Sequence, residues 1–482
     1  MRLTACRSRC SSSRARARLS IPWIACGVLL PALLAARPRR QPASPAPPAA
    51  VLAPAPPMGW NSWDSYAMSL DQSQFEATAR YMARHLRRYG WRYMVIDEGW
   101  FLKNPLSNGK PAWRYTLGRH GILLPAPNRF PLSRGGAGFK PLAAFTHRLG
   151  LRFGIHILRG IPRLAVERNL PIAGSKFHAR DAANTADTCA WNQDNYGVRD
   201  NAAGQAWYDA LFRRYARWGV DYVKVDCISS PYIGDEIRMI HRAIVRSGRP
   251  IVLSLSPGPA PLAKGPEVVR LAQLWRISGD FWDHWGPLPQ AGWSQGLQGQ
   301  FQNLAAWEKY AGPGHWPDAD MLPIGYIGPQ PGLGPARHSR FTRDEQQTIL
   351  TLWSIARSPL MMGGNLLKMN AFTRRLLTNP EVLAVDQHST ANRAILTTRR
   401  RALWRARAPG QGSKTWYVAV FNLENRRQTF RLSWKDWGLP RLSGRQFSLR
   451  DLWRRKNLGD KKQLLFRLRP HASALLSIRL LK

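Results

Sequence analysis

Acidic residues recur in this sequence at the ends of apolar segments that have the character of buried strands. The chain holds only 29 acidic residues, so their concentration at such positions is informative. A single acid at a strand end is typical of a helix cap or a structural ion pair, and only the whole set points to chemistry. With its neighbours the set comprises Trp60, Trp63, Asp64, Asp97, Glu98, Trp100, Lys224, Asp226, Arg276, Asp280, Asp318 and Asp320.

Two carboxylates that face each other across a pocket can cleave a glycosidic bond. One attacks the anomeric carbon, and the other protonates the leaving oxygen and later activates water. Tryptophan offers a flat apolar surface to a sugar ring, while short acids and lysine hold sugar hydroxyls by charge-assisted hydrogen bonds. The set therefore predicts a carbohydrate substrate.

Predicted strands and helices alternate along the chain and would bring this set together. The alternation, with near-continuous apolar strands, indicates a parallel sheet covered by helices. Eight units predict an α/β fold of the (β/α)8 TIM barrel type, whose active site lies at the carboxyl ends of the strands. A doubly wound open sheet is the alternative. We expect strands at 58–63, 93–97, 152–158, 222–226, 251–256, 274–278, 315–320 and 360–363, and helices at 72–89, 140–149, 203–218, 233–247, 297–310 and 343–357.

The pattern changes near residue 390, where short alternating segments replace the longer units. The segments 416–422, 428–433, 464–468 and 472–480 predict a small C-terminal antiparallel β-sandwich. The predicted organisation is a signal at 1–36, a Pro/Ala-rich linker at 37–53, a catalytic barrel at 54–390 and a β domain at 391–482.

The first 36 residues have the order of a secretory signal, with a basic start, an apolar run and a small-residue end. We therefore expect a secreted or periplasmic protein, and a retained N-terminal anchor is the alternative. Three of the five cysteines would leave with the signal, which leaves Cys189 and Cys227. An oxidising compartment permits a disulfide between them, and two reduced buried thiols are the alternative.

The formal net charge is +42, and nine arginines lie in the first 40 residues. The other cations are scattered over predicted helices, loops and strands, without a nucleic-acid docking motif, so we expect no nucleic-acid partner. A solvated basic surface is the main interpretation, and adhesion to anionic surfaces is the alternative. The sequence carries no signal for an oligomeric state.

Five motifs resemble those of glycoside hydrolase family 27, the α-galactosidase or melibiase family. They occur in family order over about residues 54–390, and the tail resembles the family's C-terminal β domain loosely. The resemblance implies a retaining exo-glycosidase that releases terminal α-D-galactose without a metal or organic cofactor. The motifs are PPMGWNSWDSY (56–66), YMVIDEGW (93–100), DYVKVDC (221–227), RISGD (276–280) and GPGHWPDADML (312–322).

The resemblance also implies roles for individual residues. Asp226 would be the nucleophile and Asp280 the acid/base, with their carboxyl groups about 5–5.5 Å apart for a retaining reaction. A disulfide between Cys189 and Cys227 would hold the loop beside the nucleophile. The predicted substrate-binding residues are Trp60 against the ring, Lys224 and Arg276 on ring hydroxyls, Asp97 and Glu98 on the far hydroxyls, and His156 and Asp318.

Three departures from the family pattern bear on the substrate. Glu98 replaces an aspartate, and its extra methylene places a carboxylate where a hexose has its C6 hydroxymethyl, which favours a β-L-arabinopyranoside as an alternative substrate. Ser254 and Ser256 are small and leave room for an N-acetyl group, so an α-N-acetylgalactosaminide is another alternative. His156 stands where the family often has tyrosine, and a structural role is its alternative. A non-catalytic carbohydrate-binding barrel would not need both Asp226 and Asp280.

Overall fold

The computed structural model describes residues 51–106, 113–288, 294–328, 335–410, 413–440, 443, 445–460 and 464–481. The predicted signal at 1–36 and residues 37–50 of the predicted linker lie outside these ranges, and both stay predictions. Within the described ranges, no helix has the length and apolar character that a membrane span requires.

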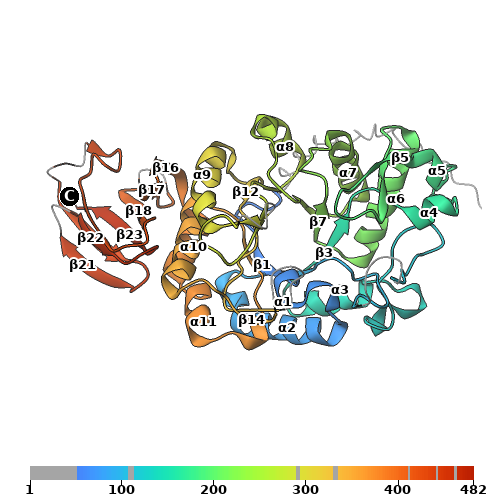
Figure 1. The fold of residues 1–482 in the computed structure, drawn as a ribbon, viewed down its shortest axis with the longest axis horizontal. Helices are drawn as coiled ribbons and strands as arrows, with labels where there is room; N and C mark the ends of the chain where they lie inside the picture. The colour runs from blue at the N-terminus through green and yellow to red at the C-terminus, as the bar shows by residue number, and fades with distance from the viewer. Residues whose placement is uncertain are drawn as a thin grey trace, which may run out of the picture. The chain divides into compact units, whose positions relative to one another are not determined.

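Eight parallel strands form the centre of the fold (Figure 1). From β1 to β12, each strand lies beside the preceding strand of the sheet, and the last strand, β15, pairs with β1. A parallel bridge between Leu322 and Met362 connects the segment after β12 to β15. This order confirms the predicted (β/α)8 barrel and excludes the doubly wound sheet. The strands are β1 (Met58–Asn61), β2 (Tyr93–Ile96), β3 (Arg152–Leu158), β7 (Tyr222–Asp226), β8 (Val252–Leu255), β9 (Leu274–Arg276), β12 (Trp316–Asp318) and β15 (Leu360–Met362).

Side chains along β7 alternate between two environments, as the period of a strand requires. Val223 and Val225 are fully buried in the apolar cluster that strands share with the surrounding helices. Tyr222 belongs to a separate apolar cluster formed by residues from six of the eight strands, in the barrel interior. Lys224 and Asp226 share the face of Tyr222, so β7 directs both of them into the barrel above this apolar layer.

The helices bury one face each against the barrel. In α2, Phe75, Ala79 and Met82 are fully buried, and the helix begins at a capping box between Asp71 and Gln74. The helices are α1 (Trp63–Tyr66), α2 (Gln72–His85), α3 (Lys140–Arg148), α6 (Ala202–Trp218), α7 (Gly234–Ser247), α8 (Gly265–Leu271), α9 (Leu297–Trp307), α10 (Arg343–Ala356), α11 (Ala371–Leu377) and α12 (Pro380–His388).

A folded excursion separates β3 from α6, in the region where the sequence is long and polar. Three short strands form an antiparallel sheet in the order β4-β6-β5. A disulfide joins Cys189, between β5 and β6, to Cys227, directly after β7, with Cα atoms 6.0 Å apart. The predicted pairing is therefore present. The elements are β4 (Ile161–Pro162), α4 (Arg163–Glu167), α5 (Ala179–Ala182), β5 (Ala183–Thr188) and β6 (Asn195–Val198).

Antiparallel strands follow the barrel and form the predicted sandwich. Six strands pair in the order β16-β17-β18-β23-β20-β21, and β19 pairs with β22. Leu403, Val418, Phe430 and Ile478 are among the apolar side chains that fill the space between the sheets. The strands are β16 (Thr390–Thr397), β17 (Arg401–Arg407), β18 (Thr415–Asn422), β19 (Gln428–Leu432), β20 (Phe447–Asp451), β21 (Lys456–Asp460), β22 (Leu464–Leu468) and β23 (Ser473–Leu480).

The segment around His471, between β22 and β23, contacts the barrel through several interactions. The His471 ring stacks on Trp285, with ring centroids 3.6 Å apart and an interplanar angle of 5°. Its Nδ1 lies 2.6 Å from Glu345 Oε1, and its backbone oxygen accepts a 2.7 Å hydrogen bond from Thr348 of α10. The C-terminal sandwich is therefore joined to the barrel by both polar and aromatic contacts.

Candidate active site

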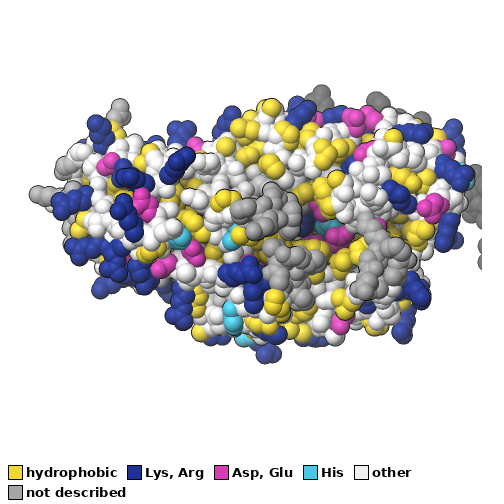
Figure 2. Space-filling view, in the orientation of Figure 1, with side chains coloured by type: hydrophobic (Ala, Val, Ile, Leu, Met, Phe, Trp, Pro, Cys, Tyr) yellow, Lys and Arg dark blue, Asp and Glu magenta, His cyan; other side chains and the backbone are white. Residues whose placement is uncertain are grey.

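A cavity of about 680 Å³ opens at the carboxyl ends of the barrel strands. Acidic side chains are visible in the hollow over the barrel in Figure 2. Parallel strands of a barrel present their carboxyl ends at one rim, which explains how residues far apart in sequence meet here. The predicted site residues that line this cavity are Asp97, Glu98, Lys224, Asp226, Arg276 and Asp280, together with Trp63, Asp64, Trp191, Ser256, Trp282 and Asp320.

Asp226 is the last residue of β7 and has two close partners. Its Oδ2 lies 3.3 Å from His156 Nε2, and its Oδ1 accepts a 2.9 Å hydrogen bond from the backbone N–H of Cys227. Burial alone would raise the pKa of Asp226, but the hydrogen bond from His156 and the charges of His156 and Lys224 outweigh it and lower the pKa. Asp226 is thus held as a carboxylate, the form that a nucleophile needs.

Asp280 lines the same cavity, and its pKa is shifted in the opposite direction. Its side chain is 44% exposed, and its Oδ1 is 3.2 Å from Arg276 Nη2. Desolvation raises the pKa of Asp280; Arg276 opposes this rise, while the negative charges of Asp320 and Asp226 add to it. The net shift is upward, so Asp280 keeps a proton to higher pH than an ordinary aspartate. A pair of acids with pKa values moved apart can divide the roles of nucleophile and proton donor.

Lys224 and Asp97 form an ion pair on the floor of the cavity. Lys224 Nζ donates to Asp97 Oδ2 at 3.0 Å, and Asn61 Nδ2 donates to the same oxygen at 2.7 Å. Burial would raise the pKa of Asp97, but Lys224 and His156 lower it well below the ordinary range. The two fixed charges offer an acceptor and a donor to the hydroxyls of a bound sugar.

Glu98 also faces the cavity, next to Asp97. Its Oε1 accepts a hydrogen bond of 2.5 Å from Asn192 Nδ2. Burial raises the pKa of Glu98, and the nearby charges of Asp226 and Asp97 raise it further, while His156 and Asn192 lower it. The sequence analysis did not find Asn192, because its contact with Glu98 crosses 94 positions and depends on the folded excursion after β3.

Trp60 does not have its predicted place against a sugar ring. It is 0% exposed, it donates from Nε1 to the Gly364 oxygen at 3.1 Å, and it is absent from the cavity lining. Trp63, three residues later at the start of α1, is half-buried and lines the cavity. Trp60 still belongs to β1 and packs in the apolar core, whereas Trp63 follows the end of the strand and reaches the cavity wall.

Two other predicted contact residues lie beneath the cavity rather than on its wall. Asp318 is 6% exposed and borders a small void with Ser254 below the floor, where burial raises its pKa to about 6. His156 is 1% exposed and reaches the cavity through Asp226. Asp320, two residues after Asp318, lines the cavity wall instead, and direct contact of His156 or Asp318 with substrate stays a prediction.

Asp320 and Arg276 form a buried ion pair behind Asp280. Arg276 Nη2 is 2.7 Å from Asp320 Oδ2, and the side chains are 2% and 5% exposed. Asp320 also accepts the backbone N–H of Phe281 at 2.8 Å, which fixes the residue after Asp280. Arg276 is therefore shared between a structural partner and Asp280.

A buried arginine supports the turn after the nucleophile. Cys227 has a φ of 61°, a left-handed conformation that is unfavourable for a residue with a side chain. Arg159 Nε donates to the Cys227 oxygen at 2.8 Å, and its other nitrogens bind Asp187 at 2.7 Å and 2.9 Å and Glu236 at 2.5 Å. Arg159 and Glu236 are 3% and 2% exposed, so the turn after Asp226 rests on a largely buried ion cluster.

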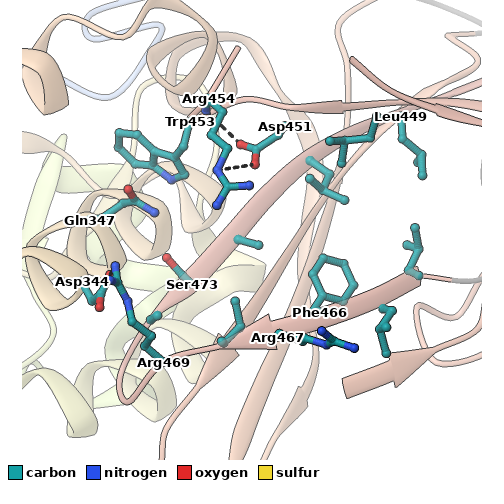
Figure 3. A pocket seen from close by; sticks show the side chains of 17 residues that line it. Asp344, Gln347, Leu449, Asp451, Trp453, Arg454, Phe466, Arg467, Arg469 and Ser473 are labelled. Atoms are coloured by element: carbon teal, nitrogen blue, oxygen red, sulfur yellow. Dashed lines mark hydrogen bonds and ion pairs between the residues drawn. The ribbon is translucent and has the colours of Figure 1, made fainter. Parts of the chain in front are cut away.

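A larger cavity, of about 830 Å³, lies in the sandwich and at α10 (Figure 3). Its labelled acids are engaged, Asp344 with Arg469 at 2.6 Å and Asp451 with Arg454 at 3.7 Å. Leucine and phenylalanine side chains of the sandwich core form much of its lining. No pair like Asp226 and Asp280, whose pKa values are shifted in opposite directions, lines this cavity in the part of the chain that the structure describes. Among the described residues, no group of three or more His, Cys, Asp and Glu side chains could hold a metal ion.

Comparisons with known proteins show which family the chain belongs to. The family model for "Alpha galactosidase A" matches residues 185–388, and the model for the "Alpha galactosidase C-terminal beta sandwich domain" matches residues 402–478. Among characterised relatives, the α-galactosidase of Cyamopsis tetragonoloba is 28% identical over 407 residues, covering 83% of this chain and 79% of the relative.

Two solved structures are more similar. The family 27 β-L-arabinopyranosidase of Geobacillus stearothermophilus is 45% identical with a TM-score of 0.82, covering 89% of this chain and 97% of that one. A putative α-N-acetylgalactosaminidase of Bacillus halodurans is 41% identical with a TM-score of 0.76, covering 88% and 97%. The chain belongs to glycoside hydrolase family 27 and is a glycosidase.

Proposed function

We propose that the chain is a retaining exo-glycosidase that works by double displacement. The ionised carboxylate of Asp226 attacks the anomeric carbon while Asp280 gives its proton to the leaving oxygen, and a covalent glycosyl-enzyme forms. Asp280, now a carboxylate, removes a proton from water, and the resulting attack on the anomeric carbon releases the sugar from Asp226. The opposite pKa shifts of these two acids in one cavity support this division of roles.

The preferred substrate is a terminal β-L-arabinopyranoside, and Glu98 carries this proposal. A β-L-arabinopyranoside has the ring stereochemistry of an α-D-galactoside and lacks only the C6 hydroxymethyl group. Glu98 extends its carboxylate into the cavity beside Asp97, and the hydrogen bond from Asn192 holds it there. A hexose would have to place its hydroxymethyl group in that space.

The comparisons support the same substrate. The Geobacillus stearothermophilus protein, 45% identical, is described as a β-L-arabinopyranosidase, and a variant of it has been solved in complex with arabinose. Release of α-D-galactose is the second candidate, because the characterised relatives at 24–28% identity are α-galactosidases. Ser256 lines the cavity, which keeps an α-N-acetylgalactosaminide as a third substrate to test.

A side-by-side assay tests the proposal. Aryl β-L-arabinopyranoside, α-D-galactopyranoside and N-acetyl-α-D-galactosaminide are compared by kcat/KM, with the product anomer followed by NMR. We expect the pentoside to be the best substrate and the first product to keep its anomeric configuration. A preference for the galactoside would reject the substrate assignment, and inversion would reject the mechanism. Glu98→Asp should raise relative activity on the galactoside.

We also propose that the protein is exported. The Cys189–Cys227 disulfide supports this, since disulfides persist in oxidising compartments. N-terminal sequencing of the protein recovered from the native source tests the proposal, and a chain that keeps residues 1–36 in the cytosol would contradict it.

A further inference from the structure

Asn192 binds Glu98 with a fixed orientation of its amide. Asn192 Nδ2 donates to Glu98 Oε1 at 2.5 Å, and Asn192 Oδ1 accepts the backbone N–H of Asp194 at 2.9 Å. A backbone N–H can bind only the oxygen of an amide, so the NH2 group of Asn192 must face Glu98. The side chain is 5% exposed and has no room to turn over freely.

The segment that carries Asn192 is anchored on both sides. Three residues earlier, Cys189 is bonded to Cys227, next to the proposed nucleophile. Three residues later, Asn195 Nδ2 donates to the backbone oxygens of Leu158 at 3.2 Å and Arg159 at 2.9 Å, at the end of β3. These two anchors fix the position of Asn192 relative to the barrel strands. Asn192 therefore keeps its place if the side chain of Glu98 rotates out of the cavity.

Glu98 needs such a partner if it is to exclude a substituent. A glutamate has three side-chain torsions, and it can swing out of a cavity unless something holds its carboxylate. The negative charges of Asp97 and Asp226 lie close enough to affect Glu98, so repulsion alone would favour its withdrawal. A short hydrogen bond to a carboxylate from a rigid amide opposes that withdrawal.

We propose that Asn192 is the specificity-positioning residue of this site: it fixes the carboxylate of Glu98 in the space of the C6 group and so excludes hexosides. The inference rests on the proposed function, in which Glu98 selects for a pentopyranoside. Asn192 does not touch the reacting atoms, and its effect is on the choice between substrates. Neither the residue type of Asn192 nor its position in the sequence predicts this role.

The test measures the ratio of kcat/KM for aryl β-L-arabinopyranoside to that for aryl α-D-galactopyranoside. Asn192→Asp is nearly isosteric and keeps the acceptor for the Asp194 N–H, but it turns a carboxylate toward Glu98. We expect the ratio to fall about tenfold or more, as for the loss of a hydrogen bond to a charged group. Asn192→Ala removes the donor to Glu98 without adding a charge, and it also removes the acceptor of the Asp194 N–H; it should lower the ratio in the same direction.

An exchange of donor and acceptor provides the rescue. In the double variant Asn192→Asp with Glu98→Gln, the new amide can donate to the new carboxylate, so most of the ratio lost in Asn192→Asp should return. The matched control is Gln193→Glu, which adds the same charge one residue away on an exposed side chain and should keep the parent ratio within twofold. Thermal unfolding of each variant confirms that the fold is retained.

The outcomes separate the two proposals. If Glu98→Asp shifts the ratio but Asn192→Asp and Asn192→Ala leave it unchanged, the role of Asn192 is rejected while the proposed substrate stands. If Glu98→Asp itself leaves the ratio unchanged, Glu98 is not the selector and the substrate assignment fails. A fall in Gln193→Glu equal to that in Asn192→Asp would assign the effect to charge in general and would also reject the role of Asn192.

Discussion

His156 Nε2 lies 3.3 Å from Asp226 Oδ2, across the neighbouring strands β3 and β7. The histidine side chain is 2% exposed, so its charge acts on the carboxylate with little screening by water. Burial would lower the pKa of His156, but Asp97 and Asp226 raise it, and the imidazolium in turn lowers the pKa of Asp226. The pair explains how a desolvated aspartate stays ionised.

Replacing His156 by glutamine should move the acidic limb of the pH–activity profile. Glutamine keeps a donor but loses the positive charge, so the pKa of Asp226 rises. The nucleophile then ionises only at a higher pH. The acidic limb of kcat/KM therefore shifts to higher pH, with a lower plateau. A pH profile on an aryl glycoside measures this, and an unmoved acidic limb would show that His156 does not set the ionisation of Asp226.

Removing either proposed reacting carboxylate should abolish or greatly reduce turnover. Asp226→Asn should leave no measurable hydrolysis. Asp280→Asn should lower kcat by about 10²–10⁴, as for loss of general acid catalysis, and less for a glycosyl fluoride, whose leaving group needs little protonation. Asp235→Asn, an exposed aspartate on α7 paired with Arg238, is the control that should retain activity. Normal turnover in Asp226→Asn would reject its assignment.

Asp320→Asn should move the alkaline limb to lower pH. The negative charge of Asp320 raises the pKa of Asp280, so its removal lowers that pKa. Arg276, released from its 2.7 Å contact with Asp320, also becomes a stronger partner for Asp280, which acts in the same direction. Asp280 therefore loses its proton at lower pH. The pH dependence of kcat/KM tests this, and a shift to higher pH would contradict the arrangement.

Arg159→Met should lower kcat by at least about tenfold with less effect on KM, because the turn at Cys227 loses its support. Breaking a buried ion cluster should also cost about 3–5 kcal/mol of folding free energy. Arg249→Met is the matched control: Arg249 clamps the other end of β7 through Asp221 at 2.5 Å and the Val220 oxygen at 2.7 Å.

The comparison is made well below the unfolding temperature of both variants. Arg249→Met should lose stability while its kcat stays within about twofold of the parent. Equal losses of kcat in the two variants would mean that Arg159 acts through general stability and not through the position of Asp226.

The two neighbouring tryptophans should respond in opposite ways. Trp60→Phe leaves the buried Gly364 carbonyl without its donor, which should cost roughly 1–3 kcal/mol of stability with little change in KM. Trp63→Ala removes an aromatic wall and should lower kcat/KM about fivefold to tenfold, with a small change in stability. Unfolding curves and steady-state kinetics measure both, and a large KM change in Trp60→Phe alone would support the predicted contact of Trp60 with the sugar ring.

The sequence predicted the barrel well because buried parallel strands have a strong local signature. Two of the strands, 152–158 and 222–226, have the predicted ends, and the other six differ by one or two residues at one or both ends. The motif residues at strand ends meet because a barrel brings all such ends to one rim. Asp97, Glu98, Lys224, Asp226, Arg276 and Asp280 line one cavity for this reason.

The differences between the predicted and the observed positions of side chains have physical causes that local sequence does not encode. Trp60 lies within β1, whereas Trp63 lies just after the end of that strand. In the same way, Asp318 is the last residue of β12 and Asp320 follows it. No strand was predicted in the excursion after β3, because its strands have two to six residues and are too short for a periodic pattern. Asn192 was missed for that reason, since its partner is set by the path of this excursion.

The stacked rings of Trp285 and His471 make the terminal sandwich part of the architecture that shapes the catalytic mouth. Trp285 lies three residues after Trp282, which forms one side of that mouth. Removing the sandwich would expose the indole of Trp285 and remove the contact that supports this side of the cavity. We therefore expect the barrel expressed without the sandwich to lose part of the structure around its cavity.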